Sequence, residues 1–145
     1  MIAIIPDILL LLFPFLMLAF KLFLTQAQTA HKNFAFAYLF ILLICQNFVL
    51  IGDTQVYFSN WQIDTFGIFM REIFTLSALL ALLLSENYFK HSMSEKPRLL
   101  HFSEFAASIG FATFGGVVVV SANDLLTLFL GLELATIPMY TLVAW

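Results

Sequence analysis

The sequence predicts an all-α, polytopic membrane protein with about five transmembrane helices in a single membrane domain, residues 1–145. Composition is the first indication, because 62% of the 145 residues are hydrophobic and only 10% are charged. Soluble domains are near 45–50% apolar and about 25% charged. The second indication is that the apolar residues form long runs separated by polar connections. The net charge of −3 is thinly spread and lacks the basic patch of a nucleic-acid-binding protein, so we expect no nucleic-acid partner.

Each apolar run is long enough, or nearly so, to cross a hydrocarbon core of about 30 Å, which takes roughly 20 helical residues. The predicted helices occupy residues 4–24, 34–52, 65–85, 103–122 and 124–145. We interpret the first as a retained spanning helix and not as a signal peptide. No Lys or Arg precedes it and no small-residue cleavage site follows it.

The charges of the connections predict the orientation of the helices. Residues 25–33 and 86–101 contain Lys or Arg, whereas residues 53–64 contain neither. Basic connections favour the cytoplasmic or matrix side. We therefore expect the first and third connections on the cytoplasmic or matrix side of the membrane, and the second and fourth connections on the opposite side.

Two connections have predicted local structure. Val56, Phe58 and Trp61 alternate with polar residues, as in a short β-hairpin arm. Residues 121–124 form a tight turn of residue types that suit the N-cap of the last helix.

No catalytic, metal or cofactor site is predicted from side-chain patterns. The sequence has no nucleophile–base arrangement, no metal-ligand cluster and no phosphate-binding glycine loop. His31, His91 and His101 lie in polar segments that flank the membrane, so we interpret them as solvated. Cys45 lies in an apolar run, where a thiol acts as a small hydrophobic side chain.

Small residues recur at intervals of four in the fourth predicted helix. The pairs are Ala106 with Gly110 and Ala112 with Gly116, next to Gly115. Such spacing lets neighbouring helices approach closely, so we interpret this pattern as a packing feature.

Glu133 is a carboxylate within the last apolar helix. It follows Asp124 by nine residues, which places it roughly 13–14 Å into a core of about 30 Å, near the membrane midplane. An acid there costs on the order of 3 kcal/mol. Thr136 and Tyr140 share its helical face. We predict that Glu133, Thr136 and Tyr140 form a proton-translocation site, the alternative being a structural glutamate paired with a base.

Pro138 follows this acid by five residues and lacks a backbone donor, which predicts a helix kink. The sequence offers no evident base for Glu133. Arg71, beside Glu72 in the third helix, lies in the outer half of the membrane by the predicted orientation. A basic group that pairs with Glu133 is therefore expected on another polypeptide.

The stretch SANDLLTLFLGLELATIPMYTL, residues 121–142, resembles the hallmark of the antiporter-like membrane subunits of respiratory complex I, NADH:ubiquinone oxidoreductase. The resemblance is closest to the N-terminal part of chain N in bacteria and NADH dehydrogenase subunit 2 in mitochondria. The preceding EFAASIGFATFGGVVVV is similar to the fourth helix of that subunit. The first three helices match only in hydropathy and in DTFGIFMREIF.

This resemblance implies a role in proton translocation that is driven by quinone reduction elsewhere in the complex. It implies no cofactor in this chain, with NADH, flavin, iron–sulfur clusters and quinone on other subunits. The glutamate of the family's fifth helix matches Glu133 and there interacts with a lysine on helix seven. Family members have many more helices than a chain that stops at Trp145, so we expect a second polypeptide that carries the remaining helices, or a fragment.

Two alternatives stay open from the sequence. One is a subunit of a multisubunit cation/proton antiporter, which shares the fold and the glutamate. The other is a structural membrane scaffold in which Glu133 only locks helix packing. The 18 phenylalanines are typical of an AT-rich organelle genome. We expect a multi-pass protein of the mitochondrial inner membrane, or of a bacterial plasma membrane, among complex I membrane-arm subunits and lipids.

Overall fold

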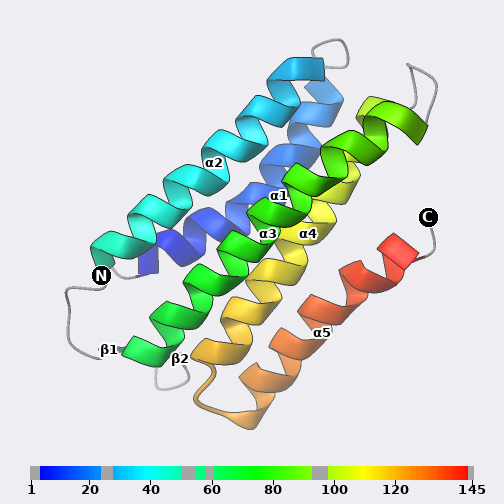
Figure 1. Ribbon diagram of the computed structural model, residues 1–145. Helices are drawn as coiled ribbons and strands as arrows, with labels where there is room; N and C mark the ends of the chain where they lie inside the picture. The colour runs from blue at the N-terminus through cyan, green and yellow to red at the C-terminus, as the bar shows by residue number, and fades with distance from the viewer. Residues whose placement is uncertain (1–3, 24–27, 50–54, 58–60, 93–97, 144–145) are drawn as a thin grey trace.

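The computed structural model describes residues 4–23, 28–49, 55–57, 61–92 and 98–143 (Figure 1). Its elements along the chain are α1 (Ile5–Phe23), α2 (Gln28–Val49), β1 (Gln55–Tyr57), β2 (Trp61–Ile63), α3 (Thr65–Ser92), α4 (Arg98–Ser121) and α5 (Leu125–Val143). Long helices run side by side and a small hairpin closes one end (Figure 1). The all-α prediction is confirmed.

Three helices in the described residues are long and apolar enough to cross a membrane, over Thr65–Ser85, Phe102–Ser121 and Leu125–Val143. Two shorter apolar stretches lie in the first two helices, at Ile5–Ala19 and Lys32–Gln46. This arrangement is that of a multi-pass membrane protein.

The helices extend beyond the apolar segments from which they were predicted. α2 begins at Gln28, α3 continues to Ser92 and α4 begins at Arg98. Hydropathy marks the residues that lipid accepts, whereas Gln, Glu, Lys and Arg are good helix formers that continue a helix into water. The first and third connections are therefore shorter than the sequence indicated.

α4 is the central helix, because it packs against α1, α3 and α5. Its glycines let neighbouring helices pack closely against more than one of its faces. A Cβ on Gly110 would lie 2.7 Å from the Phe13 ring of α1, and a Cβ on Gly116 would lie 3.1 Å from the Phe74 ring of α3. The close approach predicted from the small-residue spacing is present at both positions, and Gly115 provides another towards α5.

The apolar core lies among α1, α2, α3 and α4. Its fully buried large side chains include Leu10, Phe13, Met17, Leu39, Leu42, Leu82, Phe102 and Val117. α5 is different, because only Gly131 and Pro138 are buried in it. In Figure 1, α5 runs along the edge of the bundle next to α4, on the opposite side from α2.

The predicted hairpin arm is confirmed. β1 and β2 pair antiparallel, with Val56 opposite Gln62 and Tyr57 opposite Trp61, while Phe58 lies outside the described residues. Trp61 also forms a bridge with Ala122 in the turn between α4 and α5. We call this end of the bundle, which also holds the starts of α1 and α3, the hairpin end.

Candidate functional site

The start of α5 is held by an N-cap at the hairpin end. The Thr127 backbone N–H donates to Asp124 Oδ1 at 2.6 Å, and the Leu128 N–H donates to the Asp124 carbonyl at 3.1 Å. The first hydrogen bond, with further ones from the same turn, holds the pKa of Asp124 below its ordinary value of 3.8. The cap places Glu133 roughly 12–14 Å along the helix.

The three side chains predicted to carry protons lie on the exposed face of α5. Glu133 and Thr136 are exposed, and Tyr140 is 70% exposed. The Thr136 hydroxyl donates to the Glu133 backbone carbonyl at 3.2 Å and not to the carboxylate. The structure thus brings the three residues to one face, and their role in proton transfer stays a prediction.

The opposite face of α5 is shaped for α4. A Cβ on Gly131 would lie 2.9 Å from the backbone nitrogen of Val119. Pro138, about two helical turns further along α5, is also buried. Glu133 therefore points away from the helix on which α5 packs. The ion pairs of the described residues join other side chains, and the base expected for Glu133 on another polypeptide stays a prediction.

Large apolar side chains surround Glu133 on the outward face. The exposed ones on α5 are Leu125, Leu126, Leu128, Phe129, Leu130, Leu132, Ile137, Met139 and Val143. In a bilayer such a face meets lipid or another protein. A carboxylate at this depth is costly in lipid and typically faces protein or a water-filled cavity.

Pro138 does not end the helix, since α5 continues to Val143. The Thr141 hydroxyl donates to the Pro138 carbonyl at 2.7 Å. Proline removes one donor from the helix and crowds the carbonyl four residues earlier. The kink itself stays a prediction.

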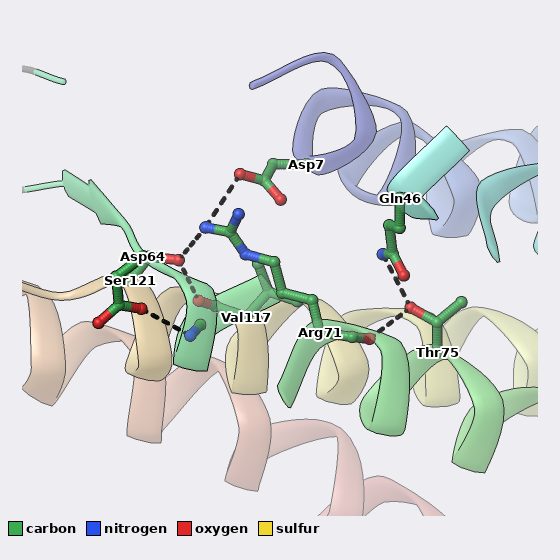
Figure 2. Close-up of polar contacts among 8 residues, drawn as sticks. Asp7, Gln46, Asp64, Arg71, Thr75, Val117 and Ser121 are labelled. Atoms are coloured by element: carbon green, nitrogen blue, oxygen red, sulfur yellow. Dashed lines mark hydrogen bonds and ion pairs between the residues drawn. The ribbon is translucent and has the colours of Figure 1, made fainter. Parts of the chain in front are cut away.

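A second set of polar side chains lies inside the bundle at the hairpin end. The sequence analysis did not predict that these side chains are neighbours. Arg71 of α3 is 3% exposed. Its Nη2 lies 3.4 Å from Asp7 Oδ2 of α1 and donates to Ser121 Oγ of α4 (Figure 2). The available signal was that Asp7 and Arg71 are charged residues within apolar helices, at ends predicted to share one side of the membrane.

A hydrogen-bonded pair lies deeper in the bundle. Gln46 Nε2 of α2 donates to Thr75 Oγ1 of α3 at 3.0 Å, and the Thr75 hydroxyl donates to the Arg71 carbonyl at 2.9 Å (Figure 2). Thr75 follows Thr65 by ten residues, or about 15 Å of helical rise. Polar contacts thus reach from the hairpin end to the middle of the apolar part of α3, Thr65–Ser85.

The other end of the bundle carries cations. Lys21 of α1 forms an ion pair and hydrogen bond with Glu104 of α4. Lys32 Nζ lies 5.9 Å from the centre of the Phe102 ring. Within the described residues, no group of three or more His, Cys, Asp or Glu side chains is placed to hold a metal ion.

No family model matches the chain, but individual proteins do. It is 37% identical over 125 residues to NADH-quinone oxidoreductase subunit N of Heliobacterium modesticaldum, covering 84% of this chain and 25% of that protein. It is 39% identical over 95 residues to subunit N of Trichlorobacter lovleyi, covering 65% of this chain and 18% of that protein.

A chloroplast protein is also similar. NAD(P)H-quinone oxidoreductase subunit 2 of Chlorokybus atmophyticus is 32% identical over 108 residues, covering 71% of this chain and 20% of that protein. The chain spans a quarter or less of the length of these relatives. It therefore belongs to the NADH-quinone oxidoreductase subunit N family, whose chloroplast form is called subunit 2, as a homologue of one part of those proteins.

Proposed function

We propose that this chain supplies the Glu133 part of a proton path in the membrane arm of a proton-translocating NADH-quinone oxidoreductase. The observation that carries the proposal is the position of Glu133, midway along the apolar α5 and on the face turned away from α4. The names of the relatives support the type of complex. NADH, flavin, iron–sulfur clusters and quinone would bind other subunits.

The proposal requires a protein neighbour on the outward face of α5. That neighbour would carry a basic side chain, such as a lysine, opposite Glu133. A carboxyl group in apolar surroundings favours its neutral form, whereas a nearby cation favours the carboxylate. Movement of the cation towards Glu133 would release a proton to adjacent water, and its withdrawal would allow a proton to bind.

Thr136 and Tyr140 would orient that water. The Thr136 hydroxyl donates its proton to the Glu133 carbonyl, so its oxygen is left to accept a hydrogen bond from water. The Tyr140 side chain is largely exposed and can both donate and accept. The two hydroxyls therefore offer complementary hydrogen bonds along one face of the helix.

We propose that the remaining helices come from a second polypeptide, next to other membrane-arm subunits. Support for this is the small share of its relatives' length that the chain covers. Mass spectrometry of the purified complex would find the second polypeptide, and a peptide that continues past Trp145 would contradict it.

We propose that the protein lies in the mitochondrial inner membrane, the alternative being a bacterial plasma membrane. Fractionation of the source cells, followed by detection of the protein in each membrane fraction, distinguishes the two.

The function is tested by Glu133→Gln in the assembled complex. We expect normal assembly and a lower ratio of protons moved to electrons transferred. The matched control is Asp124→Asn, which removes a charge from the start of the same helix while keeping a good N-cap residue. An unchanged ratio and rate in Glu133→Gln would exclude a direct role, and failed assembly would instead support the structural scaffold.

A further inference from the structure

The hairpin end of the bundle encloses a set of polar side chains from several elements. We call it the Arg71 cluster, and its members are Asp7, Gln46, Asp64, Arg71, Thr75 and Ser121, which Figure 2 shows, together with Trp61. Asp7 is 5% exposed, Arg71 3% and Gln46 3%. Their polar atoms are therefore screened from bulk water and need internal hydrogen bonds.

The ion pair at the centre of the cluster is too long for a direct, strong hydrogen bond. Arg71 Nη2 and Asp7 Oδ2 are 3.4 Å apart, whereas charge-assisted N–H···O bonds are about 2.7–2.9 Å. Asp7 Oδ2 has no hydrogen-bond partner among the described residues, and neither has Arg71 Nε. The two charges attract each other without completing each other's hydrogen bonds.

Trp61 adds a donor to the same place. Its indole lies near enough to act on the Asp7 carboxylate, yet its buried Nε1 makes no hydrogen bond of normal geometry in the described structure. Buried polar atoms that have no protein partner are commonly satisfied by ordered water. Asp7, Trp61 and Arg71 come from α1, β2 and α3, so a bridge would connect three elements.

The chemistry of these atoms fits water better than an ion. They comprise one carboxylate acceptor, one indole donor and one guanidinium donor, and a buried water typically makes two to four hydrogen bonds. Arg71 already supplies the cation that Asp7 and Asp64 attract. The Asp64 carboxylate is itself engaged, because Oδ1 accepts the Gly67 N–H at 2.6 Å.

A second incomplete group lies deeper along the same line. Gln46 bonds to Thr75 through Nε2, but its Oε1 has no partner among the described residues. Thr75 lies four residues beyond Arg71, or about 6 Å further along α3. Figure 2 shows Gln46 and Arg71 on the same side of this helix. The next buried side chains of α3 are the apolar Ala78 and Leu82, which close the polar region.

We propose that the Arg71 cluster is an internal water-binding site that extends from the hairpin end along α3 to the Gln46–Thr75 pair. Bound water joins Asp7 Oδ2 to Trp61 Nε1 and Arg71 Nε, and further water bonds to Gln46 Oε1. The site lies across α4 from α5, and it is independent of the role of Glu133.

The test is electron cryo-microscopy of the assembled complex at a resolution that shows ordered water. We expect solvent density within hydrogen-bonding distance of Asp7 Oδ2, Trp61 Nε1 and Gln46 Oε1. A direct Asp7–Arg71 hydrogen bond without solvent density would overturn the proposal. A side chain of another subunit in the same position would do so too.

The matched variant is Trp61→Phe, which removes the indole donor and keeps an aromatic ring. We expect the density beside Asp7 to weaken or move while the density at Gln46 stays. If the density at Asp7 is the same in both maps, Trp61 does not bind that water and the bridge is wrong. Should the variant fail to assemble, the map of the unaltered complex still decides the proposal.

Discussion

Gly115 of α4 and Ala135 of α5 meet backbone to backbone. A Cβ on Gly115 would lie 2.7 Å from the Ala135 Cα, closer than side-chain carbons approach one another in proteins. This contact sets how near the two helices lie, and Ala135 is only two residues from Glu133. The packing of α5 and the placement of its carboxylate are therefore connected.

Gly115→Ala is expected to separate α4 from α5, because backbone and not a movable side chain blocks the new methyl group. Overpacking of this kind typically costs about 1–3 kcal/mol. Native gels and the thermal stability of the complex would measure the loss. Gly116→Ala is the control, since its Cβ meets the Phe74 ring at 3.1 Å, which can shift. Equal losses in both variants would contradict the backbone contact.

Asp7→Leu is expected to be strongly destabilising, because it leaves Arg71 buried without its carboxylate. Breaking a buried pair costs roughly 3–5 kcal/mol, whereas replacing both members by apolar residues is often neutral. The double variant Asp7→Leu with Arg71→Leu should therefore recover most of the stability. The yield and melting temperature of the assembled complex measure this. A double variant as unstable as Asp7→Leu would show that the pair does not act as a unit.

The Gln46–Thr75 hydrogen bond predicts an asymmetric result. Thr75→Val leaves the buried Gln46 amide without its acceptor, at a cost of about 1–3 kcal/mol. Gln46→Leu leaves Thr75 with its bond to the Arg71 carbonyl, so a smaller loss is expected. Thermal unfolding of the two variants in the same complex would compare them. Gln46→Leu being the more harmful change would refute this account.

The N-cap at Asp124 predicts a pH dependence of the start of α5. Its pKa is lowered in the folded chain, so the charged cap stabilises the helix above the ordinary value of 3.8. This stabilisation is lost as the pH falls through the lower folded value. The hydrogen-exchange protection factor of the first turn of α5, which corrects for the intrinsic pH dependence of exchange, should therefore fall in acid. Asp124→Asn should remove this pH dependence, and an unchanged profile would contradict the cap.

Tyr140→Phe tests the hydroxyls beside Glu133. Since a positioned proton-transfer group contributes about a hundredfold or more, loss of an auxiliary hydroxyl is expected to slow proton translocation by a smaller factor, about tenfold, with assembly unchanged. Proton uptake by vesicles that contain the complex measures the rate. Met139→Leu is the control on the same exposed surface. Equal rates in all three proteins would remove Tyr140 from the path.

The sequence by itself determined the class of the protein and the hairpin at Trp61, and it predicts the depth of Glu133. These depend on local pattern, because lipid selects apolar runs and helical rise converts residue number into depth. The hydropathy of the runs did not determine where helices end, and α2 and α3 extend into segments predicted to be connections.

Only the tertiary structure decided which residues meet and which way each helix is turned. α5 is apolar on nearly all sides, so its sequence did not show that Gly131 and Pro138 face α4 while Glu133 faces outward. Asp7 and Arg71 are far apart in sequence and become neighbours through the packing of α1 and α3. A one-dimensional pattern specifies position along a helix axis, whereas rotation about that axis and choice of neighbour follow from close packing among several helices.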